Sequence, residues 1–109
     1  MSLKLSTRQA DDYIVIEASG QIQAGEACLQ FQEFAKPLLE KTGRVLLLLD
    51  LKNVSYIDSA GLGVLLSIYA TVRIQGGDLK LLNVSHPVKE ALTITNLLQI
   101  FEILSDPAI

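Results

Sequence analysis

Residues 45–63 read VLLLLDLKNVSYIDSAGLG and contain the junction that decides the fold. Val45–Leu51 is almost continuously apolar, which is typical of a strand that is central in a sheet or buried on both faces. A helix is expected to begin at Ser59, with Gly61 and Gly63 inside its first turn. Glycine costs about 1 kcal/mol relative to alanine in a helix interior. The two glycines therefore predict a close approach of another backbone or of a bulky group beside Ser59.

The pair Asp58-Ser59 has two interpretations. Both residue types are common N-caps, so on local chemistry alone the pair is most simply the start of a helix. The N-terminus of a helix also carries free N–H groups and partial positive charge, which favour an added anion. Ser59 is therefore a candidate phosphorylation site, at a point where a partner could press close.

Outward from this junction, strand and helix patterns alternate along the chain. The expected end signals are Gly20 for the second strand, Gly43 for the first helix and Asn96 for the last helix, while Pro37 predicts a kink or an early helix end. The predicted elements are strands at Leu3–Thr7 and Tyr13–Ala18, a helix at Gly25–Glu40, a strand at Val45–Leu51, a helix at Ser59–Gln75, a strand at Leu79–Val84, a helix from Pro87 to Ile94 and a short strand at Gln99–Leu104.

This order predicts a single α/β domain over residues 1–109, with a mostly parallel sheet. The first two strands are joined by a short turn at Asp11-Asp12 and should form an antiparallel hairpin. Right-handed crossovers would place successive helices on one side of the sheet. Functional sites in such sheets gather beyond the carboxyl ends of the strands, where Ser59, Gln23 and His86 are expected.

Composition favours a binding module over an enzyme. The net charge of −3 argues against nucleic acid or an anionic membrane surface as a partner. Cys28 is the only cysteine and is most simply a small core residue, and the single His86 disfavours histidine-based metal sites. No cofactor motif is visible, so we expect no cofactor and no metal. A small hydrolase that uses Ser59 and His86 is a much weaker alternative.

The chain shows no secretory signal, and its most apolar run, Gly61–Val72, is too short to cross a membrane. We therefore expect a cytoplasmic protein without direct membrane insertion.

Residues 53–63, NVSYIDSAGLG, resemble the signature of the STAS family, named for sulphate transporters and anti-sigma factor antagonists. In the antagonist branch the serine or threonine after the aspartate is phosphorylated, and that position is Ser59 here. Ser85-His86-Pro87-Val88 is similar to the family's Ser-Pro-x-Val helix entry, and Asn96-Leu97 stands where the family often has Gly-Leu. The resemblance covers nearly the whole chain and implies a STAS-like domain with its helices largely on one face of the sheet.

The resemblance also implies a function. Bacterial antagonists bind an anti-sigma factor that is also a serine kinase; phosphorylation ends the interaction and a phosphatase restores it. Gln23 departs from the aspartate that many antagonists carry there, which leaves a second reading open: an adaptor in a lipid-transport ATPase complex or a stress-sensing assembly, without a kinase switch. The expected partner-binding residues are Gln23, Asp58, Ala60, Gly61, Leu62, Gly63 and His86.

Overall fold

A long central strand organises the sheet of this protein, whose computed structural model describes residues 2–41 and 44–105. The described elements are β1 (Lys4–Ala10), β2 (Tyr13–Ile22), α1 (Glu26–Leu39), β3 (Leu46–Ile57), α2 (Ser59–Ile74), β4 (Asp78–Leu82), α3 (His86–Ile94) and β5 (Ile103–Leu104). The strand order is β1-β2-β3-β4-β5, with β1 antiparallel to β2 and every other pair parallel. The predicted order of elements and the N-terminal hairpin are confirmed.

β3 is longer than the apolar run that predicts it. Leu47, Leu48 and Leu49 are fully buried on alternating faces, and the strand continues past Leu51 to Ile57. The added length pairs with β2, whose last residue Ile22 lies opposite Ile57. The polar residues after Leu51 are therefore held in the strand by ladder hydrogen bonds rather than by burial of their side chains.

The prediction that Gly20 ends the second strand is wrong. β2 passes through Gly20 to Ile22, with an irregularity in its pairing to β3 between Gly20 and Gln21. Gly20 has φ +111°, and a Cβ there would lie 2.6 Å from the carbonyl oxygen of Ser2. Glycine therefore serves here as a bend within the strand and as room for the N-terminal segment.

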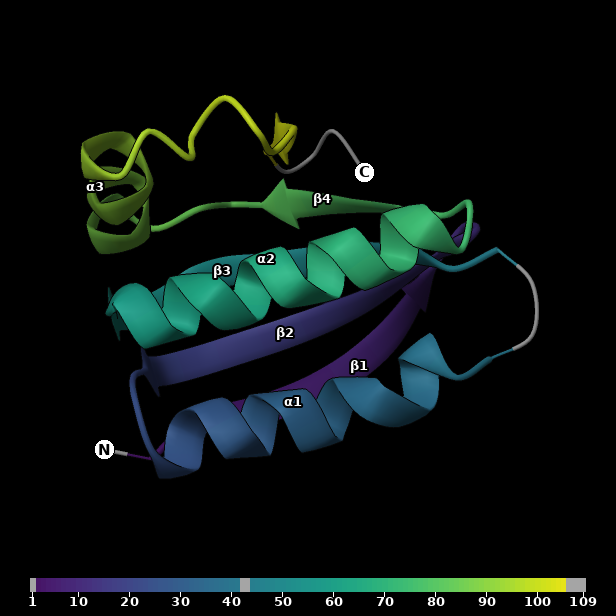
Figure 1. Cartoon of the computed structure of the whole chain (residues 1–109), viewed down its shortest axis with the longest axis horizontal. Coiled ribbons are helices and arrows are strands. Elements are labelled where there is room, and N and C mark those ends of the chain that lie inside the picture. Colours follow the sequence, from purple (N-terminus) through teal and green to yellow (C-terminus); the bar gives the residue numbers. More distant parts are fainter. Residues whose placement is uncertain (1, 42–43, 106–109) are drawn as a thin grey trace.

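The helices cover one face of the sheet, as expected, and Figure 1 shows α1 and α2 side by side across it. Phe31 of α1, Leu65 of α2 and Val88 of α3 are fully buried in one core cluster. α1 contains Pro37 and still runs to Leu39, so the alternative of an early end is wrong. The helix stop predicted at Gly43 lies outside the described residues.

The opposite face of the sheet has a smaller apolar cluster, formed by Val15, Leu48 and Leu82. These side chains alternate along their strands with those that face the helices. Ala10, Tyr13 and Leu104 pack against this cluster, and the helices leave this face of the sheet open (Figure 1).

In the C-terminal region the helix end predicted at Asn96 is confirmed, but the strand predicted at Gln99–Leu104 is shorter than expected. Asn96 has φ +60°, and the N–H groups of Leu97 and Asn96 donate to the carbonyls of Leu92 (2.8 Å) and Thr93 (3.1 Å). This is the hydrogen-bond pattern of a Schellman motif. β5 contains only two residues, because the chain from Leu97 first turns and buries Phe101 against the core.

Candidate functional site

The loops that carry the predicted residues meet at one edge of the sheet, at the left of Figure 1. β2, β3 and β4 run parallel, so their carboxyl ends point to the same edge. The N–H of Asp58 donates to the Ile22 carbonyl (3.3 Å), and Ser85 Oγ donates to the Val54 carbonyl (2.7 Å). These hydrogen bonds tie the loops after β2 and β4 to the end of β3.

Asp58 caps α2 and also holds a neighbouring loop. Its Oδ1 accepts the N–H of Gly61 (2.9 Å) and its Oδ2 accepts the N–H of Ala24 (2.9 Å). These bonds, with that to Ala24 the stronger cause, lower the pKa of Asp58 from its ordinary value of 3.8. The carboxylate is therefore directed at the protein's own backbone and is ionised at neutral pH.

Ser59 occupies the first helical position of α2 and is exposed. Within the described part of the chain, its hydroxyl makes no hydrogen bond. Ala60 and Gly63 are also exposed, and a Cβ added at Gly63 would meet nothing within 4 Å. We call Ser59, Ala60 and Gly63 the α2 surface. It is small, largely bare backbone, and it presents one free hydroxyl to solvent.

Gly61 and Leu62, which are also predicted as partner-binding residues, are not part of this surface. Leu62 is only 5% exposed, and Gly61 is buried. A Cβ at Gly61 would clash with the Ile22 carbonyl oxygen and lie 2.7 Å from Ile57 Cγ1. The close approach that the glycines predict is therefore real at Gly61, but the approaching backbone is the protein's own β2.

Gln23 lies in the loop after β2, and His86 is the first residue of α3. Gln23 is half-buried, and its Nε2 donates to Gln21 Oε1 (3.1 Å). His86 is exposed, with its Nε2 3.5 Å from Glu90 Oε2 one turn along α3. In the described ranges no hydrogen bond joins His86 to Ser59. The geometry therefore gives no support to a hydrolase in which His86 activates Ser59.

The described residues contain neither a metal-ligand cluster nor a membrane-spanning helix. Among them no group of three or more His, Cys, Asp or Glu side chains could hold a metal ion. Nor does any described helix have the length and apolar character needed to span a bilayer.

Cys28 is buried on the core side of α1, as predicted. Burial, and then the charge of Asp58, raise the pKa of its thiol.

The sequence did not indicate the bond from Ala24 to Asp58. These residues are 34 positions apart, and Ala24 has no side-chain chemistry that would mark it. Only the pairing of β2 with β3 brings them together.

Comparisons with known proteins agree with this architecture. Residues 4–108 match the STAS domain family. An anti-sigma-B factor antagonist of Bacillus subtilis is 35% identical over 103 residues, covering 94% of this chain and 92% of the relative. One from Listeria monocytogenes is 33% identical over 104 residues, covering 94% and 90%.

A solved anti-sigma-factor antagonist (STAS) domain protein from Planctomyces limnophilus superimposes with a TM-score of 0.84 at 16% identity, covering 95% of this chain and 92% of that one. That last similarity concerns the fold alone. Together with the signature around Ser59, these matches show that the chain belongs to the STAS domain family, in the branch of the anti-sigma factor antagonists.

Proposed function

We propose that this chain is an anti-sigma factor antagonist of the bacterial cytoplasm, acting by binding rather than by catalysis. It binds an anti-sigma factor that is also a serine kinase and thereby frees the sigma factor. Phosphorylation of Ser59 ends the interaction, and a phosphatase restores it. The observation that carries the proposal is the exposed, unbonded hydroxyl of Ser59 at the first position of α2, in a chain whose relatives are named as antagonists.

The charges around Ser59 support a switch. Phosphorylation adds about −1.5 to −2 charges at neutral pH. Asp58, the adjacent residue, is already ionised, and it occupies the N–H of Gly61 that a phosphate on the helix start would otherwise use. The free N–H groups at the start of α2 therefore neutralise less of the phosphate charge than the sequence alone suggests. That charge remains at the surface, where it would oppose an acidic or apolar partner.

The shape of the α2 surface supports close contact with a partner backbone. Ala60 and Gly63 project little or no side chain, so another chain can approach the helix next to Ser59. Gln23 in the loop after β2 and His86 at the start of α3 are proposed to border the contact. Gly61 and Asp58 support it indirectly, by fixing the helix against β2.

The decisive experiment is titration calorimetry of the chain against the anti-sigma factor from the same organism. We expect Ser59→Ala to keep the affinity, while Ser59→Asp and, more strongly, phosphorylated protein lose at least about tenfold, equivalent to about 1.4 kcal/mol. Ser67→Asp is the matched control, because Ser67 is exposed on the same helix two turns away. It adds the same charge and should leave binding unchanged.

Mass spectrometry after incubation with the kinase and ATP tests the modification itself. We expect phosphate on Ser59 in the native chain and none in Ser59→Ala. Equal affinity of unmodified and phosphorylated protein would contradict the switch and favour the adaptor reading, in which Ser59 carries no regulatory charge. Modification of another residue with Ser59 untouched would contradict the assigned site.

A further inference from the structure

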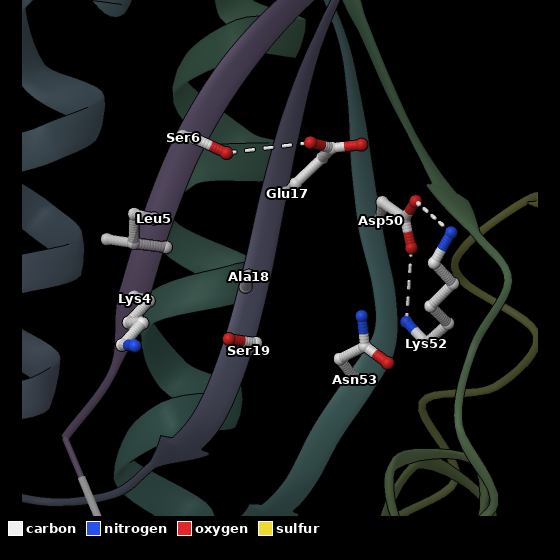
Figure 2. Close-up of a pocket in the computed structure, with 9 residues that line it drawn as sticks. All are labelled: Lys4, Leu5, Ser6, Glu17, Ala18, Ser19, Asp50, Lys52 and Asn53. Carbon is white, nitrogen blue, oxygen red and sulfur yellow. Dashed lines mark hydrogen bonds and ion pairs between the residues drawn. The ribbon is translucent and has the colours of Figure 1, made fainter.

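The open face of the sheet carries a polar cavity that has no part in the proposed switch (Figure 2). It lies across β1, β2 and β3 and has a volume of about 530 Å³. Pockets for small molecules typically measure about 300–1,000 Å³. The cavity is on the side of the sheet away from α1 and α2, so a ligand here would not touch the α2 surface.

One side chain in this cavity is a buried carboxylate, and one of its two oxygens has no hydrogen-bond donor among the described residues. Asp50 is only 2% exposed. Its Oδ1 accepts the N–H of Lys52 (3.1 Å), but Oδ2 has no hydrogen-bond partner among the described residues. Lys52 Nζ is 3.8 Å from Oδ2, beyond hydrogen-bond distance, on a side chain that is 53% exposed. A buried carboxylate oxygen without a donor is costly and calls for an explanation.

A second carboxylate faces the first. Glu17 on β2 lies directly opposite Asp50 on β3 in the parallel ladder. Like charges placed opposite each other destabilise a sheet. Arg8 binds Glu17 from the β1 side (Nε to Oε2, 2.9 Å), and Ser6 Oγ lies 3.5 Å from its other oxygen. Figure 2 shows the Glu17 carboxylate lying between β2 and β3 on the side of Asp50. Arg8 thus compensates Glu17, while Asp50 lacks an equivalent close cation.

We propose that this cavity binds a ligand through a primary ammonium or guanidinium group that donates a hydrogen bond to Asp50 Oδ2, with Glu17 as the second negative charge. Such a group supplies the missing hydrogen-bond donor, and its positive charge adds to that of Lys52, which is paired with the same oxygen at 3.8 Å. A metal ion fits less well, because no cluster of three or more acidic, histidine or cysteine side chains is present in the described residues. The remainder of the cavity is lined by the apolar side chains of Leu5 and Ala18 and by the polar side chains of Lys4, Ser6, Ser19, Lys52 and Asn53.

The test is a titration of the isotope-labelled full chain by two-dimensional NMR, with putrescine and agmatine as probes. We expect saturable shifts of the backbone signals of Glu17, Asp50 and Asn53. Tetramethylammonium carries the charge but no N–H donor and should bind at least about tenfold more weakly, as expected for loss of a charged hydrogen bond. A capped peptide with one lysine distinguishes the source: tighter binding than putrescine indicates a protein side chain, and weaker binding a free amine.

Variants give the test its controls. Asp50→Asn keeps the shape but removes the charge, so it should abolish the shifts, whereas Asp12→Asn in the exposed hairpin turn should not. Lys52→Gln removes the competing cation and should strengthen binding; a purely structural ion pair would give no gain. Ser59→Asp should bind the probes as the native chain does, which separates this proposal from the switch.

Several results would overturn the inference. They are the absence of saturable shifts at millimolar probe, equal binding of tetramethylammonium, unchanged binding by Asp50→Asn, or binding of inorganic phosphate at Lys4 and Lys52 in place of the amines. If Asp50→Asn does not fold, Glu17→Gln decides, since an unchanged affinity in that variant would leave the paired carboxylates without a role.

Discussion

At the scale of single residues, Asp50 in β3 and Asp58 at the start of α2 show how the surroundings of a carboxylate decide what it does. Asp58 accepts backbone N–H groups on both oxygens, so its charge is stabilised and the loop at Ala24 is held to the start of α2. Asp50 is far more buried, yet only one of its oxygens has a hydrogen-bond donor in the described structure. The first aspartate stabilises the fold, and the second is left able to receive a donor from outside.

Asp58→Ala should lower the free energy of unfolding by about 1–2 kcal/mol, because it removes both the N-cap and the bond from Ala24. Asp58→Asn should cost less, since asparagine is also a good N-cap. Urea denaturation at neutral pH measures both. Equal losses in the two variants would show that charge, not capping, is what matters at this position.

The stability that Asp58 contributes should depend on pH in one direction. Its pKa is lowered from 3.8 in the folded chain, so its contribution is complete above about pH 4 and is lost as the pH falls through the folded pKa. The difference in unfolding free energy between native protein and Asp58→Asn should therefore shrink in acid. A difference that stays constant from neutral pH to below the folded pKa would contradict this assignment.

At the scale of elements, the N-terminal end of α2 has two different sides. One side packs closely against the sheet, and the other is exposed to solvent. Gly61 faces β2 and has no room for a side chain, whereas Gly63 faces open space. Both glycines lie in the first turns of one helix, so propensity alone treats them alike. Their different surroundings make them a matched pair for experiment.

Gly61→Ala should destabilise the chain by about 1–3 kcal/mol, the usual cost of overpacking, because its Cβ meets the Ile22 carbonyl. Gly63→Ala should instead stabilise it by up to about 1 kcal/mol through helix propensity. Thermal unfolding of the two variants gives the comparison. A stabilised Gly61→Ala would show that α2 can move away from β2.

Gly63→Val should fold and yet weaken partner binding, which titration calorimetry against the anti-sigma factor can check.

At the scale of the whole molecule, the core is divided unequally between the two faces of the sheet. The helix side holds the large cluster, and the open side holds only the small one around Val15, Leu48 and Leu82. β3 lies in the middle of the sheet and contributes to both. β5, by contrast, is an edge strand of two half-buried residues.

Amide hydrogen exchange should follow this division. The slowest amides are expected in β3 at Leu47–Leu49, where both faces are buried and both neighbours are paired. The fastest strand amides are expected in β5. Exchange followed by NMR under native conditions measures the order. Protection of β5 equal to that of β3 would mean that the sheet opens only as one unit.

The sequence by itself determined what depends on local pattern. The apolar run after Val45 indicated the central strand, Asp58 and Ser59 indicated the start of α2, and Asn96 indicated the end of α3. The order of elements and the α/β class followed from these signals, because period and end chemistry are properties of short segments. The family signature around Ser59 is equally local.

Only the tertiary structure decided what depends on a distant neighbour. β2 continues past Gly20 and β3 past Leu51, because each strand supplies the other's hydrogen bonds. Gly61 faces the protein's own β2 while Gly63 faces solvent, a difference set by where the sheet lies rather than by the residue itself. The pairing of Glu17 with Asp50 also arises from strand register. Register joins residues far apart in the chain, so no local pattern could have revealed it.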